Sequence, residues 1–237
     1  FDDSPALRDP NPVVILWQGV GMFTFAKNKQ TARVSSEFYI NAINVMKGAE
    51  AISKYCGLAE QEAFNIEYWL LEEAKLQRLP KENSLTRKVA LITGAAGGIG
   101  KAVAVRFLEE SACVILTDVD ENALKATSEE LAQQFGKDVV RFCAFDVSDS
   151  GQVENAFKKT MLEFGGIDVL VNNAGLARAG ALQDTSEKEW DLLQDVMVKG
   201  QFLLSKAAVE IMRKQGRGGG IVNVVSKNAL VAGPNNV

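Results

Sequence analysis

The chain contains no histidine among its 237 residues. Histidine is the side chain that most often exchanges protons near neutral pH, and it is a common metal ligand. Its absence excludes a Ser-His-Asp or Cys-His nucleophile pair, and any His-bearing metal cage, within these residues. Proton transfer by this chain must therefore use Asp, Glu, Lys, Tyr, Ser or Cys.

Cysteine is scarce as well. Three cysteines are too few, and odd in number, for a disulfide framework. Cys113 and Cys143 stand in apolar, strand-like runs, and Cys56 follows a helical stretch. We expect all three to be small core residues of a protein in the reducing cytoplasm.

Long apolar runs and an excess of positive charge are missing too. No apolar run reaches the ~18 residues of a membrane span, because Gln18, Gly19 and Gly21 break the longest one, at 12–26. No basic leader followed by an apolar core indicates a secretory signal. The net charge of −4 argues against a broad nucleic-acid surface. We expect neither a membrane nor a nucleic-acid partner.

A linker-like segment, LPKENSL at 79–85, divides the chain. We assign residues 1–80 to one domain, 81–86 to the linker and 87–237 to a second domain. The first domain shows strand-like runs at 12–17 and 22–25, helical periodicity at 29–55 and 60–78, and a dense apolar block at 68–71. Such a block is more often a packing surface against another domain than a ligand platform.

The second domain alternates between apolar strand-like runs and amphipathic helical stretches. The predicted strands are 89–93, 113–117, 139–145, 167–172 and 220–225, and the predicted helices lie near 98–110, 121–135, 150–164 and 186–214. Strands without a polar face, separated by helices, predict an α/β fold with a doubly wound parallel sheet covered on both sides.

The segment TGAAGGIG at 93–100 follows the first of these strands and opens the first helix. Gly94, Gly98 and Gly100 leave no Cβ in the way of a tight turn. A pyrophosphate can then approach the backbone N–H groups at the helix N-terminus. The alternative is a turn whose glycines serve only helix–strand packing.

Asp118 closes the second strand, 18 residues after Gly100. A carboxylate there can accept hydrogen bonds from an adenosine ribose and repels a 2′-phosphate. Since the turn contains no Lys or Arg, NAD is favoured over NADP. Asp118 could instead cap a helix, although Asp120 is better placed for that role. Asp146 closes the third strand and could reach an adenine edge or cap the helix beginning near Ser150.

Four motifs occur in this order along the second domain: TGAAGGIG, Asp146-Val147, NNAG at 172–175 and IVNVVS at 221–226. Residues 87–237 thereby resemble the classical short-chain dehydrogenase/reductases, which implies a Rossmann-type fold and NAD-dependent oxidoreductase activity. The cofactor-binding residues implied by the resemblance are Gly94, Gly98, Ile99, Gly100, Asp118, Val119, Asp146, Val147, Asn173, Ala174 and Gly175.

The resemblance assigns the role of the family's substrate-binding serine to Ser226. Alternatively, Ser226 is a solvated serine in an ordinary loop. The family's Tyr and Lys would fall just past Val237. Tyr39, Tyr55 and Tyr68 all precede the linker and cannot replace that tyrosine. The adjacent Lys227 is not assigned as the missing base.

At the family's asparagine position this chain has Met197. A thioether cannot donate a hydrogen bond. The water-linked proton relay that the family's asparagine supports must therefore be changed, bypassed or lost.

The first domain resembles the end of a class II aldolase/adducin-type domain, on the segment VGMFTFAKNKQTA at 20–32. Val20, or Gln18 in another register, stands where such aldolases carry a metal-binding His. We predict no metal ligand in this chain, and a divalent metal only in the upstream aldolase part of a parent protein, if retained there.

The stretches EFYINAINVMKGAEAI at 37–52 and IEYWLLEEAKLQRLP at 66–80 resemble bifunctional bacterial proteins that fuse such an aldolase to a short-chain dehydrogenase. Their association is with deoxysugar breakdown: cleavage of rhamnulose 1-phosphate and oxidation of lactaldehyde. The first residue, Phe1 rather than Met, fits a piece of a longer chain.

We therefore expect an inactive fragment of an NAD-dependent oxidoreductase for a sugar, a sugar phosphate or a small hydroxy-aldehyde such as lactaldehyde. A homo-oligomer paired through the helices at 150–164 and 186–214 is expected from the resemblance. The main alternative is a non-catalytic dinucleotide-binding or structural protein on a decayed dehydrogenase fold. A methyltransferase is disfavoured by NNAG and IVNVVS.

Overall fold

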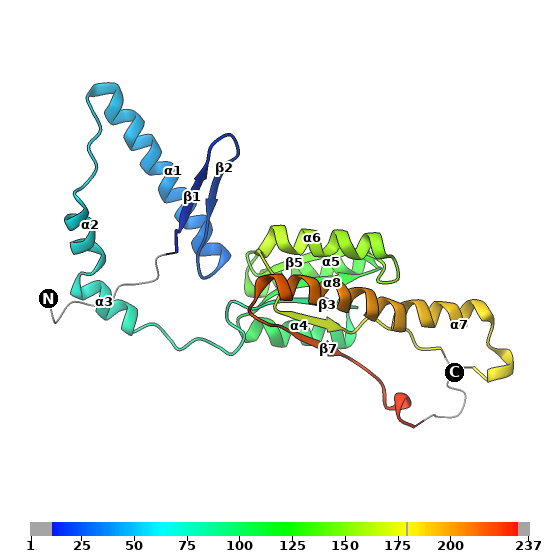
Figure 1. The fold of residues 1–237 in the computed structure, drawn as a ribbon. Coiled ribbons are helices and arrows are strands. Elements are labelled where there is room, and N and C mark those ends of the chain that lie inside the picture. The colour runs from blue at the N-terminus through cyan, green and yellow to red at the C-terminus, as the bar shows by residue number, and fades with distance from the viewer. Residues whose placement is uncertain (1–10, 179, 232–237) are drawn as a thin grey trace. The chain divides into compact units, whose positions relative to one another are not determined.

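A computed structural model of the chain describes residues 11–178 and 180–231. The chain separates into two compact units, with the boundary between Glu82 and Asn83 (Figure 1). Among the described residues, none of the helices combines the length and apolarity that crossing a membrane requires.

The N-terminal unit begins with a β-hairpin. Strand β1 (Val14–Trp17) pairs antiparallel with β2 (Gly21–Thr24). The long helix α1 (Lys29–Ile52) follows and contacts both strands. It begins where the Asn28 side chain accepts the N–H of Thr31 at 2.8 Å, which satisfies one of the free donors of the first helical turn.

The predicted helix over 60–78 is two helices, α2 (Glu60–Glu67) and α3 (Leu70–Gln77). The backbone leaves the helical region at Tyr68 and is extended at Trp69, where φ is −66° and ψ is 134°. Aromatic residues are weak helix formers, and the Tyr68 ring stacks on Phe64 with centroids 4.5 Å apart. The break leaves Trp69 and the two leucines after it exposed.

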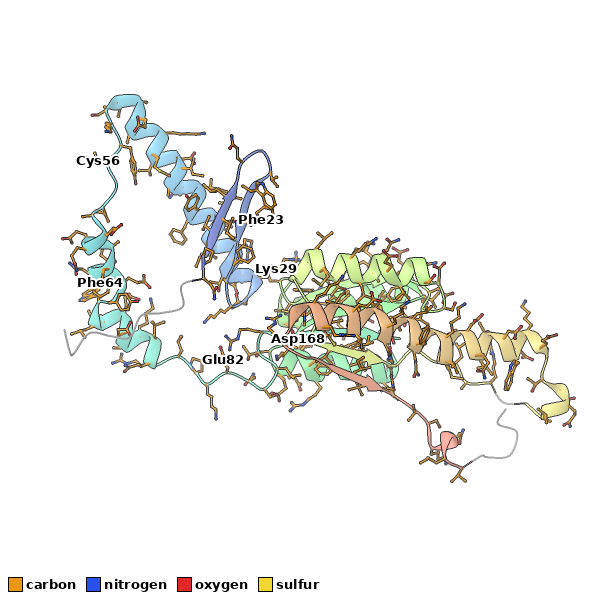
Figure 2. The ribbon with its side chains drawn as sticks, viewed as in Figure 1. Phe23, Lys29, Cys56, Phe64, Glu82 and Asp168 are labelled. Atoms are coloured by element: carbon orange, nitrogen blue, oxygen red, sulfur yellow. The ribbon has the colours of Figure 1, made fainter. Side chains whose placement is uncertain are left out.

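The expectation that all cysteines are core residues is wrong for Cys56. This residue lies between α1 and α2 and is exposed (Figure 2). Cys143 is buried and Cys113 is half-buried. The difference follows from position, because the latter two stand on strands of the central sheet whereas Cys56 stands in a connection.

The C-terminal unit is a parallel sheet of five strands with helices between them. Its elements are β3 (Val89–Thr93), α4 (Gly98–Glu109), β4 (Cys113–Asp118), α5 (Glu121–Phe135), β5 (Val140–Ala144), α6 (Ser150–Phe164), β6 (Val169–Asn172), α7 (Glu187–Gln194), α8 (Gly200–Gln215) and β7 (Gly220–Asn223). The strand order is β5-β4-β3-β6-β7. The predicted α/β doubly wound fold is confirmed.

Two hydrophobic clusters cover the two faces of this sheet. Successive residues of β3 alternate between them: Leu91 packs in the cluster of α6 and α8, and Ile92 in the cluster of α4 and α5. A central parallel strand is therefore apolar along its whole length. Strand β7 differs from the prediction, because all four of its residues are exposed at one end of the sheet.

The predicted helix over 186–214 is also interrupted. Between α7 and α8 the backbone forms a π-helical segment, Asp195–Lys199, in which the N–H of Gly200 bonds to the carbonyl of Asp195. Gly200 is buried, and a Cβ there would lie 2.9 Å from the Val147 side chain. The close approach of α8 to Val147, three residues beyond β5, thus favours glycine at this position.

The strand order brings the carboxyl ends of β3 and β6 together. From β3 the chain moves outward through β4 and β5, then returns to the other side of β3 as β6. In open parallel sheets, ligands bind at this point where the direction of winding reverses. The glycine turn follows β3 and the NNAG segment follows β6, so both motifs lie at this crevice.

Candidate cofactor and active site

The glycine turn occupies the carboxyl end of β3. Gly94 and Gly98 have φ values of +64° and +55°, a backbone region that favours glycine. A Cβ on Gly100 would lie 2.8 Å from the Asn173 amide nitrogen and closer still to the Gly94 carbonyl oxygen. Gly97 and Gly98 face open space, with no atom within 4 Å of a built Cβ. The turn is thus packed on one side and open on the other.

Thr93, the last residue of β3, and Asn173, which follows the neighbouring strand β6, hold the turn in place. The Thr93 hydroxyl accepts the N–H groups of Asn173 and Ala174, both at 2.9 Å. The Asn173 amide donates to the carbonyls of Thr93 and Gly94, at 2.9 and 3.1 Å. Both donors of this side chain therefore hold protein backbone, and contact of Asn173 with a cofactor stays a prediction.

Asp118 lies directly beside the turn. Its carboxylate accepts the N–H of Ala96 at 3.2 Å and the N–H of Asp120 at 3.1 Å. A carboxylate has roughly four acceptor sites, so capacity remains for two ribose hydroxyls. Asp120 caps α5 by accepting the Ala123 N–H at 3.0 Å, which confirms the cap assignment. Val119 is largely exposed next to the carboxylate.

Lys101 is the first basic residue after the turn. Its ammonium group lies 2.7 Å from the Glu130 carboxylate, in an ion pair between α4 and α5. The charge is therefore already compensated.

The alternative role of Asp146 as a helix cap is wrong. Asp149 caps α6, by accepting the N–H groups of Gly151 and Gln152 at 2.8 and 3.0 Å. The hydrogen bond from the Gln152 N–H is the main cause that lowers the pKa of Asp149. Asp146 instead accepts the N–H and hydroxyl of Ser148, at 2.8 and 2.7 Å.

The Val147 side chain does not face the crevice. It is 8% exposed and packs in the core against Gly200. Contact of Val147 with a cofactor stays a prediction. Ile99, by contrast, is largely exposed in the first turn of α4.

The structure brings Met197 to the loop after β6. A Cβ on Gly175 would lie 3.9 Å from the Met197 sulfur. Ser226 lies three residues beyond β7, at the start of a short 3₁₀ turn (Lys227–Ala229), and its hydroxyl accepts the Asn228 N–H at 3.3 Å. Ser226 is exposed. Ser226 thus follows β7, and Met197, from the segment between α7 and α8, approaches the loop after the neighbouring strand β6.

The site residues predicted from the sequence do not include two buried polar side chains at this edge of the sheet. Thr93, which holds the NNAG segment, is a hydroxyl at the end of a fully buried apolar strand. Asn172 is 1% exposed at the end of β6. A polar residue closing an apolar strand is the signal that could have found both. Within the described part of the chain, no three His, Cys, Asp or Glu side chains lie together as a metal-binding group.

Comparison with known proteins decides the family. The short chain dehydrogenase family profile matches residues 88–237. The chain belongs to the short-chain dehydrogenase family. Residues 2–76 match the profile named aldolase class II, second domain, so the sequence joins an aldolase-like segment to a dehydrogenase domain.

Individual relatives agree with this assignment. The chain is 41% identical to the uncharacterized oxidoreductase YuxG of Bacillus subtilis over 98% of its own length and 34% of that protein. It is 36% identical to the NADP-dependent (R)-specific alcohol dehydrogenase of Lentilactobacillus kefiri, over 63% of this chain and 58% of the relative. The chain thus spans about a third of YuxG and somewhat over half of the second relative.

A solved structure shares the fold. The short chain dehydrogenase/reductase of Burkholderia phymatum, in complex with NAD, superposes with a TM-score of 0.61 at 32% identity. The match covers 66% of this chain and 54% of that protein.

Proposed function

We propose that these residues belong to a longer bifunctional protein, in which an aldolase-like domain (1–80) is joined by a linker (81–86) to an NAD-dependent dehydrogenase domain (87–237). The two family matches and the boundary between the compact units support this division. The observation that carries the proposal is the glycine turn with the Asp118 carboxylate bonded to it. NAD, when bound, accepts a hydride from the substrate carbon.

The turn suits a dinucleotide. Its open side at Gly97 and Gly98 lets a pyrophosphate reach the N–H groups at the start of α4, where the helix dipole favours negative charge. Asp118 would accept the ribose hydroxyls and repel a 2′-phosphate. Because relatives include both an NAD complex and an NADP-dependent enzyme, the preference for NAD rests on Asp118 and on the compensated charge of Lys101.

Ser226 would donate a hydrogen bond to the substrate oxygen. The proton transfer itself needs a phenol beside a Lys, since positive charge brings a tyrosine pKa toward neutrality. We expect that Tyr and Lys outside these 237 residues, so the isolated chain should not turn over. Met197 lies at the family's asparagine position, so the proton relay must differ from that of the family.

The fusion suggests the substrate class. An aldolase cleaves a phosphorylated sugar into two carbonyl compounds, and an attached oxidoreductase can oxidise one of them. A small hydroxy-aldehyde such as lactaldehyde is the proposed substrate, with a sugar or sugar phosphate as the broader class. Three free cysteines fit a reducing cytoplasmic location.

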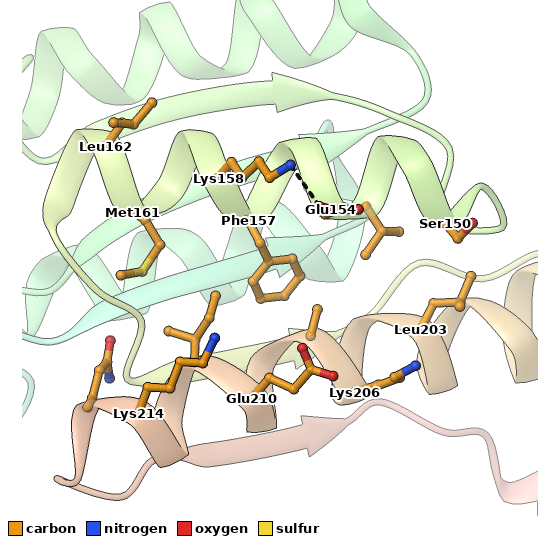
Figure 3. Close-up of a pocket in the computed structure, with 14 residues that line it drawn as sticks. Ser150, Glu154, Phe157, Lys158, Met161, Leu162, Leu203, Lys206, Glu210 and Lys214 are labelled. Carbon is orange, nitrogen blue, oxygen red and sulfur yellow. Dashed lines mark ion pairs between the residues drawn. The ribbon is translucent and has the colours of Figure 1, made fainter.

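We also propose a homo-oligomer. A groove of about 920 Å³ runs between α6 and α8 (Figure 3). Phe157, Met161 and Ile211 contribute apolar surface, while Glu154 and Lys158 form an ion pair of 2.7 Å within it. Charges of both signs around an apolar strip suit a two-fold contact with a second copy, in which each patch meets itself.

In the test, the complete protein is mixed with NAD and candidate aldehydes. Turnover is measured as the rise in absorbance of the reduced cofactor. Ser226→Ala should lower kcat by about 10²-fold, the typical loss of one donor at a reacting oxygen, with NAD affinity unchanged. Full activity in this variant would refute the role of Ser226. Robust turnover by the 237-residue chain alone would refute the expected placement of the tyrosine.

The second candidate is a non-catalytic dinucleotide-binding protein. Met197 favours it, because the thioether supplies no donor for a proton relay. NAD binding by the complete protein, without turnover of any aldehyde or alcohol, would support this alternative.

A further inference from the structure

A side-chain hydrogen bond joins the last residues of β6 and β7. The amide nitrogen of Asn172 donates to the side-chain oxygen of Asn223 at 2.8 Å and to the Ser205 hydroxyl of α8 at 3.2 Å. Asn172 and Asn223 are register partners in the parallel ladder. The bond therefore closes the carboxyl end of this strand pair.

Apolar packing does not explain Asn172. Its side chain is buried, and the oxygen of its side-chain amide (Oδ1) has no hydrogen-bond partner within the part of the chain that the structure describes. An unpaired buried carbonyl is unfavourable, and an apolar side chain of similar volume avoids that cost. Leu170, on the same face of β6, shows what the packing alone prefers.

The position of the bond suggests its role. Asn172 leads directly into Asn173, which holds the glycine turn. On the other strand, the Val224 N–H still bonds to the Asn172 carbonyl at 2.9 Å, and two residues later comes Ser226. The Asn172–Asn223 bond thus ties the segment that carries Ser226 to the segment that holds the cofactor turn.

We propose that Asn172 and Asn223 are positioning residues, which fix Ser226 relative to the cofactor-binding loop. This inference rests on the dehydrogenase function proposed above. In the bond observed, Asn223 is the acceptor, and an aspartate can take that role whereas a leucine or alanine cannot.

The experiment uses the complete protein and measures kcat, KM, NAD affinity and the melting temperature. Asn223→Leu should lower kcat about tenfold, since displacement of a reacting group by a fraction of an ångström already costs rate. Its NAD affinity should stay within about twofold of the wild type, because the glycine turn keeps its own bonds to Asn173. Asn223→Asp should restore kcat to within about twofold.

Thr160→Val is the matched structural control. It removes a buried hydrogen bond of 2.9 Å between the Thr160 hydroxyl and the Ala156 carbonyl in α6, away from the crevice. This variant should lower the melting temperature and leave kcat unchanged. Asn172→Leu, which also removes the unpaired carbonyl, should lower kcat without a greater loss of melting temperature than the control.

An unchanged kcat in Asn223→Leu would overturn the inference, as would an equal loss in Asn223→Asp and Asn223→Leu. If Asn223→Leu does not fold, Asn223→Ala provides the same comparison with aspartate. Ser226→Ala is measured in parallel. If Ser226→Ala is fully active, the proposed function fails; if it is inactive while Asn223→Leu is not, only the positioning role fails.

Discussion

Substitution of Gly100 and Gly97 separates the two possible roles of the glycine turn. Gly100 lies on the packed side, where a Cβ would stand 2.8 Å from both the Asn173 amide nitrogen and the Gly94 carbonyl carbon. Ordinary contacts begin near 3.4 Å. The obstacle is partly backbone, held in place by the Asn173 bonds, so the strain cannot be relieved by a rotamer change.

Gly100→Ala should therefore destabilise the fold by about 3 kcal/mol, the upper end of the usual cost of overpacking. For a chain of this size, that loss lowers the melting temperature by about 6–12 °C. Thermal unfolding followed by circular dichroism measures it. A melting temperature equal to that of the wild type would refute the packing described for this turn.

Gly97→Ser tests the open side. The residue has an extended backbone (φ −170°) at the N-cap of α4, where serine is favourable, and its Cβ meets no atom within 4 Å. The melting temperature should stay within about 2 °C. NAD affinity, measured by titration, should fall about tenfold, since the added side chain occupies space needed by the pyrophosphate. Undiminished NAD affinity would mean that the glycines serve packing alone.

Three further predictions test other parts of the molecule. Asp118→Asn should raise the NADP-to-NAD affinity ratio about tenfold by removing the charge that repels a 2′-phosphate; an unchanged ratio in competition titrations would exclude the ribose assignment. Ile211→Glu places a charge in the groove between α6 and α8 and should shift the oligomer toward monomer in analytical ultracentrifugation, whereas Glu187→Gln, on α7 and away from that groove, should not. Hydrogen bonding lowers the pKa of Asp149 below its ordinary 3.8, so its cap stabilises above that value and is lost as the pH falls through the lowered pKa. Between pH 5 and pH 3, the melting temperature of Asp149→Asn should therefore fall by less than that of the wild type.

The sheet was predictable because its signal is strong. Strands such as 89–93 are buried on both faces and therefore read as unbroken apolar runs, and the glycines after them mark the turn. Helix interruptions carry no such signal. The π-helical segment around Met197 lies in a continuous amphipathic pattern, and only the bond from Gly200 to Asp195 reveals it.

The direction in which side chains point at the site also could not be predicted from the sequence. Val147 and Val119 each come directly after an aspartate, yet the side chain of Val147 is buried against Gly200 whereas that of Val119 is exposed. Both side-chain donors of Asn173 bind the turn, and its predicted contact with a cofactor stays a prediction. Tertiary packing decides which atoms of these residues remain available to a ligand.

The bonds from Asn173 and Ala174 to Thr93 join residues that are 80 and 81 positions apart. Such non-local contacts close long loops and form slowly. During synthesis, the glycine turn leaves the ribosome long before the segment that locks it. The turn therefore stays unlocked until β6 has paired with β3, and cofactor binding can report the completion of this half of the domain. A nascent chain that ends before residue 172 should bind no NAD, however well its first two strands have folded.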